Sequence, residues 1–221
     1  MLFRSHGFAV RFQLPTRDGR RVHTDVIAHS TPTFPTRTGA EFLELLTAIG
    51  ASASSTESPS PVEKFLGSHP AAHHHVTNPP PVTGSYATDT FYGVNAFHLV
   101  AADGKSTAIR YRIIPSSTPT TLSAKELEAK PDNFLRTDLE SRIGAGPLVF
   151  SLVAQLAASG DQTDDATVLW PEDRQTVELG QIKLDKLLDE EDGAKEQKSV
   201  IFDPIQIGRA SCRERVWIKC R

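Results

Sequence analysis

The sequence predicts one α+β domain in which helices are inserted between the strands of an antiparallel sheet. Two pairs of extended segments, 7–29 and 91–115, each carry hairpin turn chemistry, and neighbouring hairpins indicate antiparallel pairing. Helix starts with capping-box spacing follow each pair, so helices and strands are interspersed along the chain. The length of 221 residues suits a single domain of ordinary size.

The first hairpin is predicted from alternation. Apolar residues alternate with smaller or polar ones over 8–14, which is typical of a half-buried strand. The segment 17–20 supplies turn residues, and 22–29 is the expected return strand. Ile27 and His29 are two positions apart and are therefore expected on the same face of that strand.

Two helices joined by a loop are predicted after this hairpin. Thr38 and Glu41 have capping-box spacing immediately before an apolar run. The expected elements are a helix beginning at Phe42, a Pro-containing polar loop at 51–61, a helix at 61–75 and a proline stop at 79–81. Three consecutive histidines, 73–75, end the second helix, but successive helical residues point about 100° apart and cannot converge on one ion. No metal ligands are assigned to this sequence.

The rest of the interior predicts more strands and one more helix. The expected elements are strands at 91–100 and 107–115 around an Asp-Gly turn, a helix at 122–143 that starts with a Ser123–Glu126 capping box, and strands at 147–156 and 176–187. On the second of these strands Ile109 and its alternating neighbours form an apolar face, with Arg110 and Arg112 on the other.

Composition excludes several classes of function. A hydrophobic content of 38% does not suit a disordered chain, and no apolar run reaches the ~20 residues of a membrane-spanning helix. The net charge of -3 and pI of about 6.2 lack the broad basic surface of a nucleic-acid-binding protein. We therefore expect a soluble protein with no nucleic-acid or membrane partner.

The last fourteen residues, 208–221, differ sharply in composition from the rest. They hold five basic residues, one acidic residue and both cysteines of the chain. Residues 207–216 resemble a translated sequencing adapter, so we expect 1–207 to be the domain and 208–221 a non-native tail. Cys212 and Cys220 are eight apart with no histidine nearby, which matches no zinc-site spacing.

An ordered set of short motifs covers nearly the whole interior. The motifs, in chain order, are GFAVRF at 7–12, STPTF at 30–34, Phe42, SYAT at 85–88, FYGVNAF at 91–97, Gln155-Leu156, DDAT at 164–167, WPEDR at 170–174 and FDP at 202–204. Together they resemble the haem catalase family, and within it the branch of small catalase-related peroxidases. The set is specific although no single motif is decisive.

The resemblance implies an antiparallel β-barrel with inserted and surrounding helices, and a haem b bound at the barrel's edge. The implied substrate is hydrogen peroxide, with a small reductant as second partner and a role in oxidative stress. In the family a distal histidine moves a proton between the peroxide oxygens, and a proximal tyrosine, ionised by a nearby arginine, ligates the iron. A second copy of the chain, in a homo-oligomer, is a further possible partner.

The resemblance also assigns candidate site residues. Gly7 matches a small residue close to the haem, Ile27 an apolar wall position, Phe34 a distal aromatic and Phe42 the ring that stacks on the porphyrin. His29 stands where the family has a distal asparagine that hydrogen-bonds peroxide, and is the candidate catalytic residue. An imidazole ordinarily titrates near neutral pH, so protonation of His29 is expected to modulate activity. The alternative reading is a strand residue with a satisfied nitrogen.

The family's distal histidine and proximal tyrosine have no counterpart among the matched positions. His6 and His23 do not fall at the first, and Tyr86, Tyr92 and Tyr111 match other family positions. We therefore expect a fragment that lacks both ends, with negligible catalase activity on its own. Two alternatives stay open: a non-catalytic β-barrel that binds haem or an apolar ligand, and a lipid-hydroperoxide enzyme on the same fold. The preferred peroxide, the reductant, the oligomeric state and the compartment, cytoplasmic or periplasmic, are not determined by the sequence.

Deleting 208–221 is expected to leave the thermal unfolding midpoint within about a degree, since exposed termini make few contacts. Differential scanning calorimetry of the full and shortened chains measures this. A loss of several degrees would show that Trp217 or the cysteines pack on the domain.

Overall fold

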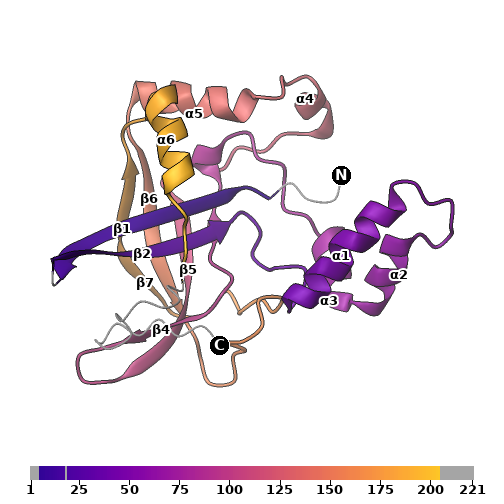
Figure 1. Ribbon diagram of the computed structural model, residues 1–221, viewed down its shortest axis with the longest axis horizontal. Coiled ribbons are helices and arrows are strands. Elements are labelled where there is room, and N and C mark those ends of the chain that lie inside the picture. The colour runs from indigo at the N-terminus through magenta and orange to yellow at the C-terminus, as the bar shows by residue number, and fades with distance from the viewer. Residues whose placement is uncertain (1–4, 18, 205–221) are drawn as a thin grey trace.

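One antiparallel sheet organises the part of the protein that the computed structural model describes, residues 5–17 and 19–204 (Figure 1). Its strands are β1 (Gly7–Arg17), β2 (Arg20–His29), β3 (Phe91–Tyr92), β4 (Phe97–Val100), β5 (Ser106–Pro115), β6 (Leu148–Leu156) and β7 (Thr176–Leu184). They run in the order β1-β2-β3-β5-β6-β7, with β4 also paired to β5. All ladders are antiparallel, as the sequence predicts.

The sheet curls tightly enough to enclose its own core. Phe8 on β1 lies 5.2 Å, ring centre to ring centre, from Phe150 on β6, although three strands separate β1 from β6 in the sheet. Buried residues from β2, β3, β4, β5, β6 and β7 meet in this one cluster. No ladder joins β1 to β7 within the described ranges, so the α+β class is confirmed in the form of a curled half-barrel.

The predicted strand 91–100 is wrong in one respect, because the structure divides it into β3 and β4. Both pair with β5, and the four residues between them oppose only two residues of β5. Gly93 opens this bulge and donates its N–H to the Tyr111 carbonyl at 2.8 Å. A Cβ at Gly93 would lie 3.3 Å from the Tyr111 Cβ, so the close approach favours glycine.

Helices α1 (Gly39–Ser52), α2 (Pro61–Ser68) and α3 (Pro70–Thr77) form a separate group beside the β1–β2 hairpin (Figure 1). Thr38 caps α1 by accepting from the Glu41 N–H, whereas the Glu41 carboxylate accepts from Arg37 rather than closing a capping box. The predicted helix 61–75 is two helices, because Pro70 disfavours helical geometry at His69. Leu45, Phe65 and Ala72 form the small core of the group.

The predicted helix 122–143 is also divided, into α4 (Ala124–Glu128) and α5 (Phe134–Ala145), with Pro131 between them. The Ser123–Glu126 capping box is confirmed at the start of α4. A last helix, α6 (Glu190–Ser199), was not predicted. No helix of the described ranges combines the length and apolarity needed to cross a bilayer. The tail 208–221 lies outside the described residues.

A buried ion pair attaches the segment after α6 to the outer face of the β1–β2 hairpin. Arg11 donates two hydrogen bonds to the Asp25 carboxylate, whose side chain is fully buried, and one to the Ile201 carbonyl. The Asp203 N–H also donates to Asp25, at 2.7 Å. Burial raises the pKa of Asp25, but hydrogen bonds from Arg11 and Asp203, with the charges of Arg11 and His23, bring it below its usual value.

Replacing Arg11 by methionine is expected to lower the free energy of unfolding by about 3 kcal/mol, because a buried carboxylate loses its partner. Chemical denaturation at neutral pH measures this. The deficit should shrink as pH falls through the lowered pKa of Asp25, since the protonated carboxyl no longer needs a cation. Lys195→Met is the control, because its pair with Glu191 is exposed and is expected to contribute about 0.5 kcal/mol or less. Equal losses in the two variants would contradict the anchoring role.

Candidate functional site

The outer face of β2 presents the two candidate residues that the sequence places together. Val26 and Ala28 point into the barrel core with 5% and 1% exposure. Ile27 and His29 alternate with them, so both lie on the opposite face. Ile27 is 44% exposed there, which is unusual for an isoleucine in the middle of a sheet. Their shared face is thus confirmed.

A row of residues crosses the sheet at the level of His29. Gly7 on β1 pairs with His29, His29 pairs with Tyr92 on β3, and Tyr92 pairs with Arg112 on β5. Paired residues of an antiparallel ladder lie on one face, so all four side-chain positions face outward. A Cβ at Gly7 would meet no described residue within 4 Å, so no neighbour in the described part of the chain packs against this position.

Two phenylalanines connect His29 to the helix group. Phe34, in the segment after β2, lies 6.1 Å from the His29 ring and 5.1 Å from the Phe42 ring, between ring centres. Phe42 stands in the first turn of α1 and packs on the helix-group core. The Phe34 N–H donates to the Ala166 carbonyl at 2.9 Å, which fixes this segment against the loop after β6. The structure therefore brings His29, Phe34 and Phe42 into one continuous contact.

The His29 ring is held at one nitrogen and buried without a partner at the other. Its Nδ1 lies 2.6 Å from the Thr31 hydroxyl. Its Nε2 is buried and has no hydrogen-bond partner among the described residues. Burial lowers the pKa of His29 to about 4, and the charge of His75 adds to this. The expectation that His29 titrates near neutral pH is therefore wrong: a desolvated imidazole keeps its neutral form.

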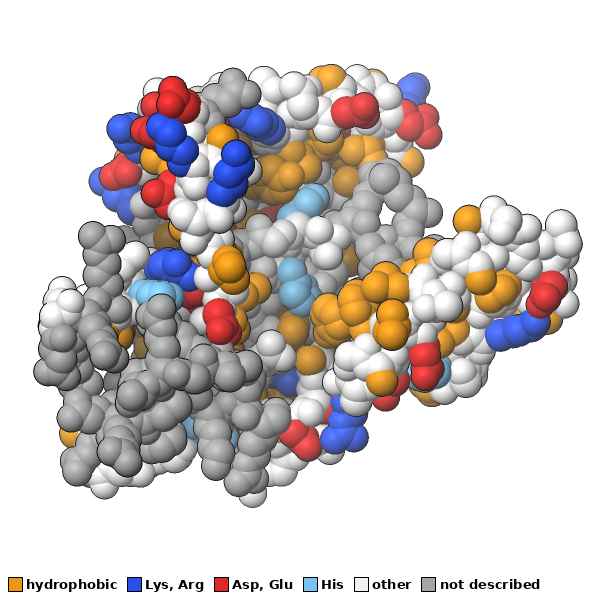
Figure 2. Space-filling view, in the orientation of Figure 1, with side chains coloured by type: hydrophobic (Ala, Val, Ile, Leu, Met, Phe, Trp, Pro, Cys, Tyr) orange, Lys and Arg blue, Asp and Glu red, His pale blue; other side chains and the backbone are white. Residues whose placement is uncertain are grey.

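His75 is the member of the histidine run that approaches the site. It lies on α3, where burial lowers its pKa, and the Thr33 hydroxyl is 3.4 Å from its Nδ1. Its two predecessors in the run, His73 and His74, are exposed. No group of three or more metal-ligating side chains occurs in the described ranges. In Figure 2 histidine side chains lie in the hollow between the sheet and the helix group, bordered by hydrophobic side chains.

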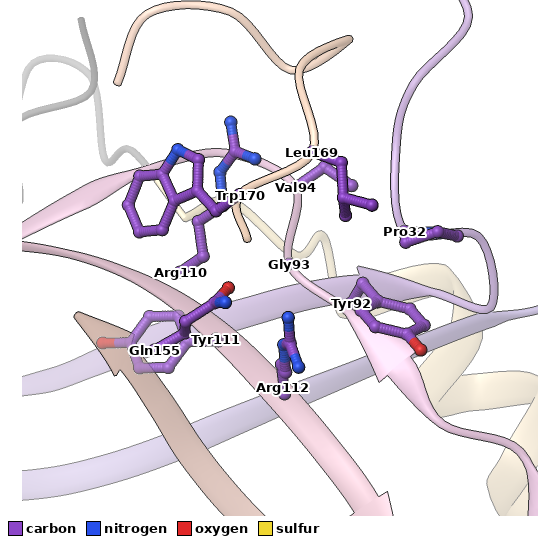
Figure 3. Close-up of a pocket in the computed structure, with 10 residues that line it drawn as sticks. All are labelled: Pro32, Tyr92, Gly93, Val94, Arg110, Tyr111, Arg112, Gln155, Leu169 and Trp170. Atoms are coloured by element: carbon purple, nitrogen blue, oxygen red, sulfur yellow. The ribbon is translucent and has the colours of Figure 1, made fainter. Parts of the chain in front are cut away.

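A second pocket, which the sequence did not single out as a site, lies on the outer face over β3, β5 and β6 (Figure 3). The Arg110 guanidinium stacks 4.6 Å from the Trp170 ring and donates to the carbonyls of Asp165 and Val168. Burial lowers the pKa of Arg110 to about 10, against the opposing charges of Asp165 and Asp161. The remaining cavity is about 10 Å³, room for about one water molecule.

Most polar groups of this second pocket already have partners. Arg112 forms a salt bridge with Glu172 at 2.7 Å and lies over the Tyr92 ring, and Gln155 donates to the Pro171 carbonyl. Only the alternation of Arg110 and Arg112 on an otherwise apolar strand signals this pocket in the sequence. By contrast, nothing in the sequence indicated that Thr31 would contact the His29 ring or that His75, in the run 73–75, would approach it.

Comparisons with known proteins agree on one family. A family model described as Catalase matches residues 4–208. A catalase-related peroxidase of Mycolicibacterium paratuberculosis (strain ATCC BAA-968 / K-10) is 30% identical over 208 residues, covering 91% of this chain and 62% of that protein. A catalase-related peroxidase of Synechococcus elongatus (strain ATCC 33912 / PCC 7942 / FACHB-805) is 29% identical over 184 residues, covering 80% and 52%. The chain thus spans less than two thirds of the length of these relatives.

Solved structures support the fold. A bacterial catalase superposes with a TM-score of 0.66 at 21% identity, covering 82% of this chain and 37% of that one. A fungal catalase superposes with a TM-score of 0.71 at 17% identity, covering 90% and 41%. At these identities the likeness concerns the fold alone.

The lowered pKa of His29 predicts a pH dependence of stability. Between pH 6.5 and about 4 the unfolded histidine binds a proton that the folded one does not. As the pH is lowered across this window, the free energy of unfolding should therefore fall by up to about 1.4 kcal/mol per pH unit. Above pH 6.5 His29 should contribute nothing to the pH dependence of stability.

Urea denaturation of wild type and His29→Asn at several pH values tests this, because the variant should lose that part of the slope. His73→Asn, on the exposed side of α3, is the matched control and should keep it. Identical slopes in wild type and His29→Asn would show that the imidazole is solvated.

Proposed function

This chain belongs to the catalase family, in its catalase-related peroxidase branch, and on that premise we propose that it forms one wall of a haem pocket in an enzyme that consumes hydrogen peroxide. One observation carries the proposal: the buried Nε2 of His29 has no hydrogen-bond partner among the described residues, and its ring adjoins the rings of Phe34 and Phe42. A polar group without a partner beside apolar surface is typical of a ligand site.

The residues present fit one face of a flat, largely apolar macrocycle. Phe42 and Ile27 supply apolar contact surface. Ile27 is 44% exposed, as expected of an apolar residue that a bound ligand would cover. Gly7 leaves free space where a side chain would stand. Proteins of this family bind haem, and haem b is the form we propose here. When bound, that group supplies the redox chemistry for reducing peroxide.

In this proposal His29 holds a peroxide oxygen by hydrogen bonding. Its ring is neutral at physiological pH, so it acts through a neutral N–H or lone pair and not as a cation. Phe34 and Phe42 exclude water from its side of the cavity, which strengthens that hydrogen bond. A small reductant as second substrate and a homo-oligomeric assembly belong to the same proposal.

Reconstitution with haem tests the function. We expect the purified protein to develop a Soret band distinct from that of free haem, with one haem per chain at saturation. Shifts of that band on addition of hydrogen peroxide or a fatty-acid hydroperoxide then compare the two ligands, while turnover by this chain should stay negligible. A tighter shift with the lipid peroxide would replace hydrogen peroxide in the proposal, and the absence of a distinct Soret band would overturn it.

Phe42→Ala is expected to weaken haem retention by about 1–3 kcal/mol, because a buried aromatic face against a flat apolar ligand is lost. Haem transfer to a stronger acceptor protein measures retention, and unfolding midpoints with and without haem separate binding from folding.

Phe65→Ala is the matched control, since Phe65 lies in the core of the helix group at 8% exposure. It should destabilise the protein with and without haem equally. The same pattern in Phe42→Ala would show that Phe42 is only a core residue.

A further inference from the structure

Thr31 contacts the His29 ring through two different groups. It follows β2 by two residues and is 6% exposed. Its backbone N–H donates to Nδ1 of His29 at 3.4 Å, and its hydroxyl oxygen lies 2.6 Å from the same nitrogen. The segment thus turns back on the histidine and meets only one of its two ring nitrogens.

The backbone contact determines the direction of these hydrogen bonds. An amide N–H can only donate, so the nitrogen it meets must accept and cannot carry a proton. The hydroxyl, whose proton rotates freely, then donates to Nδ1 as well. A neutral imidazole has one proton, and with Nδ1 accepting, that proton is on Nε2.

The groups that surround the ring favour its neutral form. The charge of His75 on α3 opposes a charge on the ring, Tyr92 pairs with His29 across the β2–β3 ladder, and the Phe34 ring packs against it; none of these is an anion that would stabilise an imidazolium. The ring therefore presents Nε2–H as a buried donor that has no acceptor in the described part of the protein. A buried donor of this kind is costly unless a ligand accepts from it.

We propose that Thr31 is a positioning residue that holds His29 in the Nε2–H tautomer, so that the ring offers a fixed N–H donor to an oxygen of a small bound ligand. The identity of that ligand as peroxide rests on the proposed function.

The tautomer of His29 can be measured directly by long-range ¹H–¹⁵N correlation in the ¹⁵N-labelled protein. His29→Asn identifies the His29 signals among the eight histidines of the chain. We expect Nδ1 to be unprotonated and Nε2 protonated in wild type. Thr31→Val removes the hydroxyl, which can pair with either tautomer, but keeps the backbone N–H, so the Nε2–H form should stay dominant. Thr31→Pro removes the backbone N–H as well, and the ratio of the Nε2–H to the Nδ1–H form should fall about fivefold, the effect of one neutral hydrogen bond.

Thr31→Ser keeps both the hydroxyl and the backbone N–H and should show the wild-type ratio. A dominant Nδ1–H form in wild type, or an unchanged ratio in Thr31→Pro, would overturn the proposal. Should Thr31→Pro fail to fold, the wild-type, Thr31→Ser and Thr31→Val spectra still decide, because all three must show the Nε2–H form.

A titration of the haem-free protein with hydrogen peroxide tests whether the donor is open to an oxygen ligand. The His29 Nε2 signals should shift in wild type and Thr31→Ser, and less in Thr31→Pro; no shift in wild type would refute an accessible donor. Failure of the proposed function is a separate outcome, because it would appear as lost haem capture with the tautomer unchanged.

Discussion

The alternation of side chains along β2 is the constraint on which the site depends. Val26 and Ala28 lie in the barrel core, in one cluster with buried residues of five other strands. Their burial leaves Ile27 and His29 no position but the outer face. A shift of one residue in the β1–β2 register would exchange the two pairs, placing an imidazole in the apolar core and destroying both the core and the site. The hydrophobic effect that closes the half-barrel therefore also orients the candidate ligand-binding face.

The helix group converts that outer face into an enclosed environment. α1, α2 and α3 share a small core of their own, and Phe42 at the start of α1 extends it towards Phe34. Phe34 in turn is held by a backbone hydrogen bond to the loop after β6. This contact chain desolvates His29, and desolvation is the main reason that its pKa lies near 4 instead of near neutrality. Enclosure thus determines the chemistry of the imidazole: it is a neutral hydrogen-bonding group and not a proton carrier at physiological pH.

Polar groups on the same outer face differ in how fully the fold supplies them with hydrogen-bond partners. Asp25 is buried and fully paired with Arg11, which fastens the segment after α6 to the hairpin. His29, four residues further along β2, keeps a nitrogen without a partner in the described residues. Arg110 and Arg112 resemble Asp25 in this respect, since backbone carbonyls and Glu172 accept from them. Arg110 keeps a buried Nε without a partner in the described residues, as His29 keeps Nε2, but its two other guanidinium nitrogens bind backbone carbonyls, whereas the free nitrogen of His29 borders the aromatic rings.

The sequence by itself determined the local features. Alternating residues predicted the β1–β2 hairpin, the strands β5, β6 and β7, and the shared face of Ile27 and His29, because the period of a strand is a property of the backbone. Capping residues located the starts of α1 and α4. The breaks before Pro70 and Pro131 were present in the sequence as well, but the apolar pattern on each side continued across them and hid them. The charged α6 has little apolar pattern, so periodicity did not reveal it.

The tertiary structure decided what depends on distant residues. The curl of the sheet comes from Phe8 meeting Phe150, and the split of β3 from β4 comes from the close approach of Gly93 to β5. The protonation of His29 was predicted wrongly, because a pKa depends on the solvent that Phe34, His75 and their neighbours exclude. The role of Thr31 was likewise invisible, since two residues of separation in sequence say nothing of which ring nitrogen a backbone N–H will meet. Local periodicity follows from the order of residues alone, whereas desolvation and hydrogen-bond direction arise only when the folded chain surrounds a group.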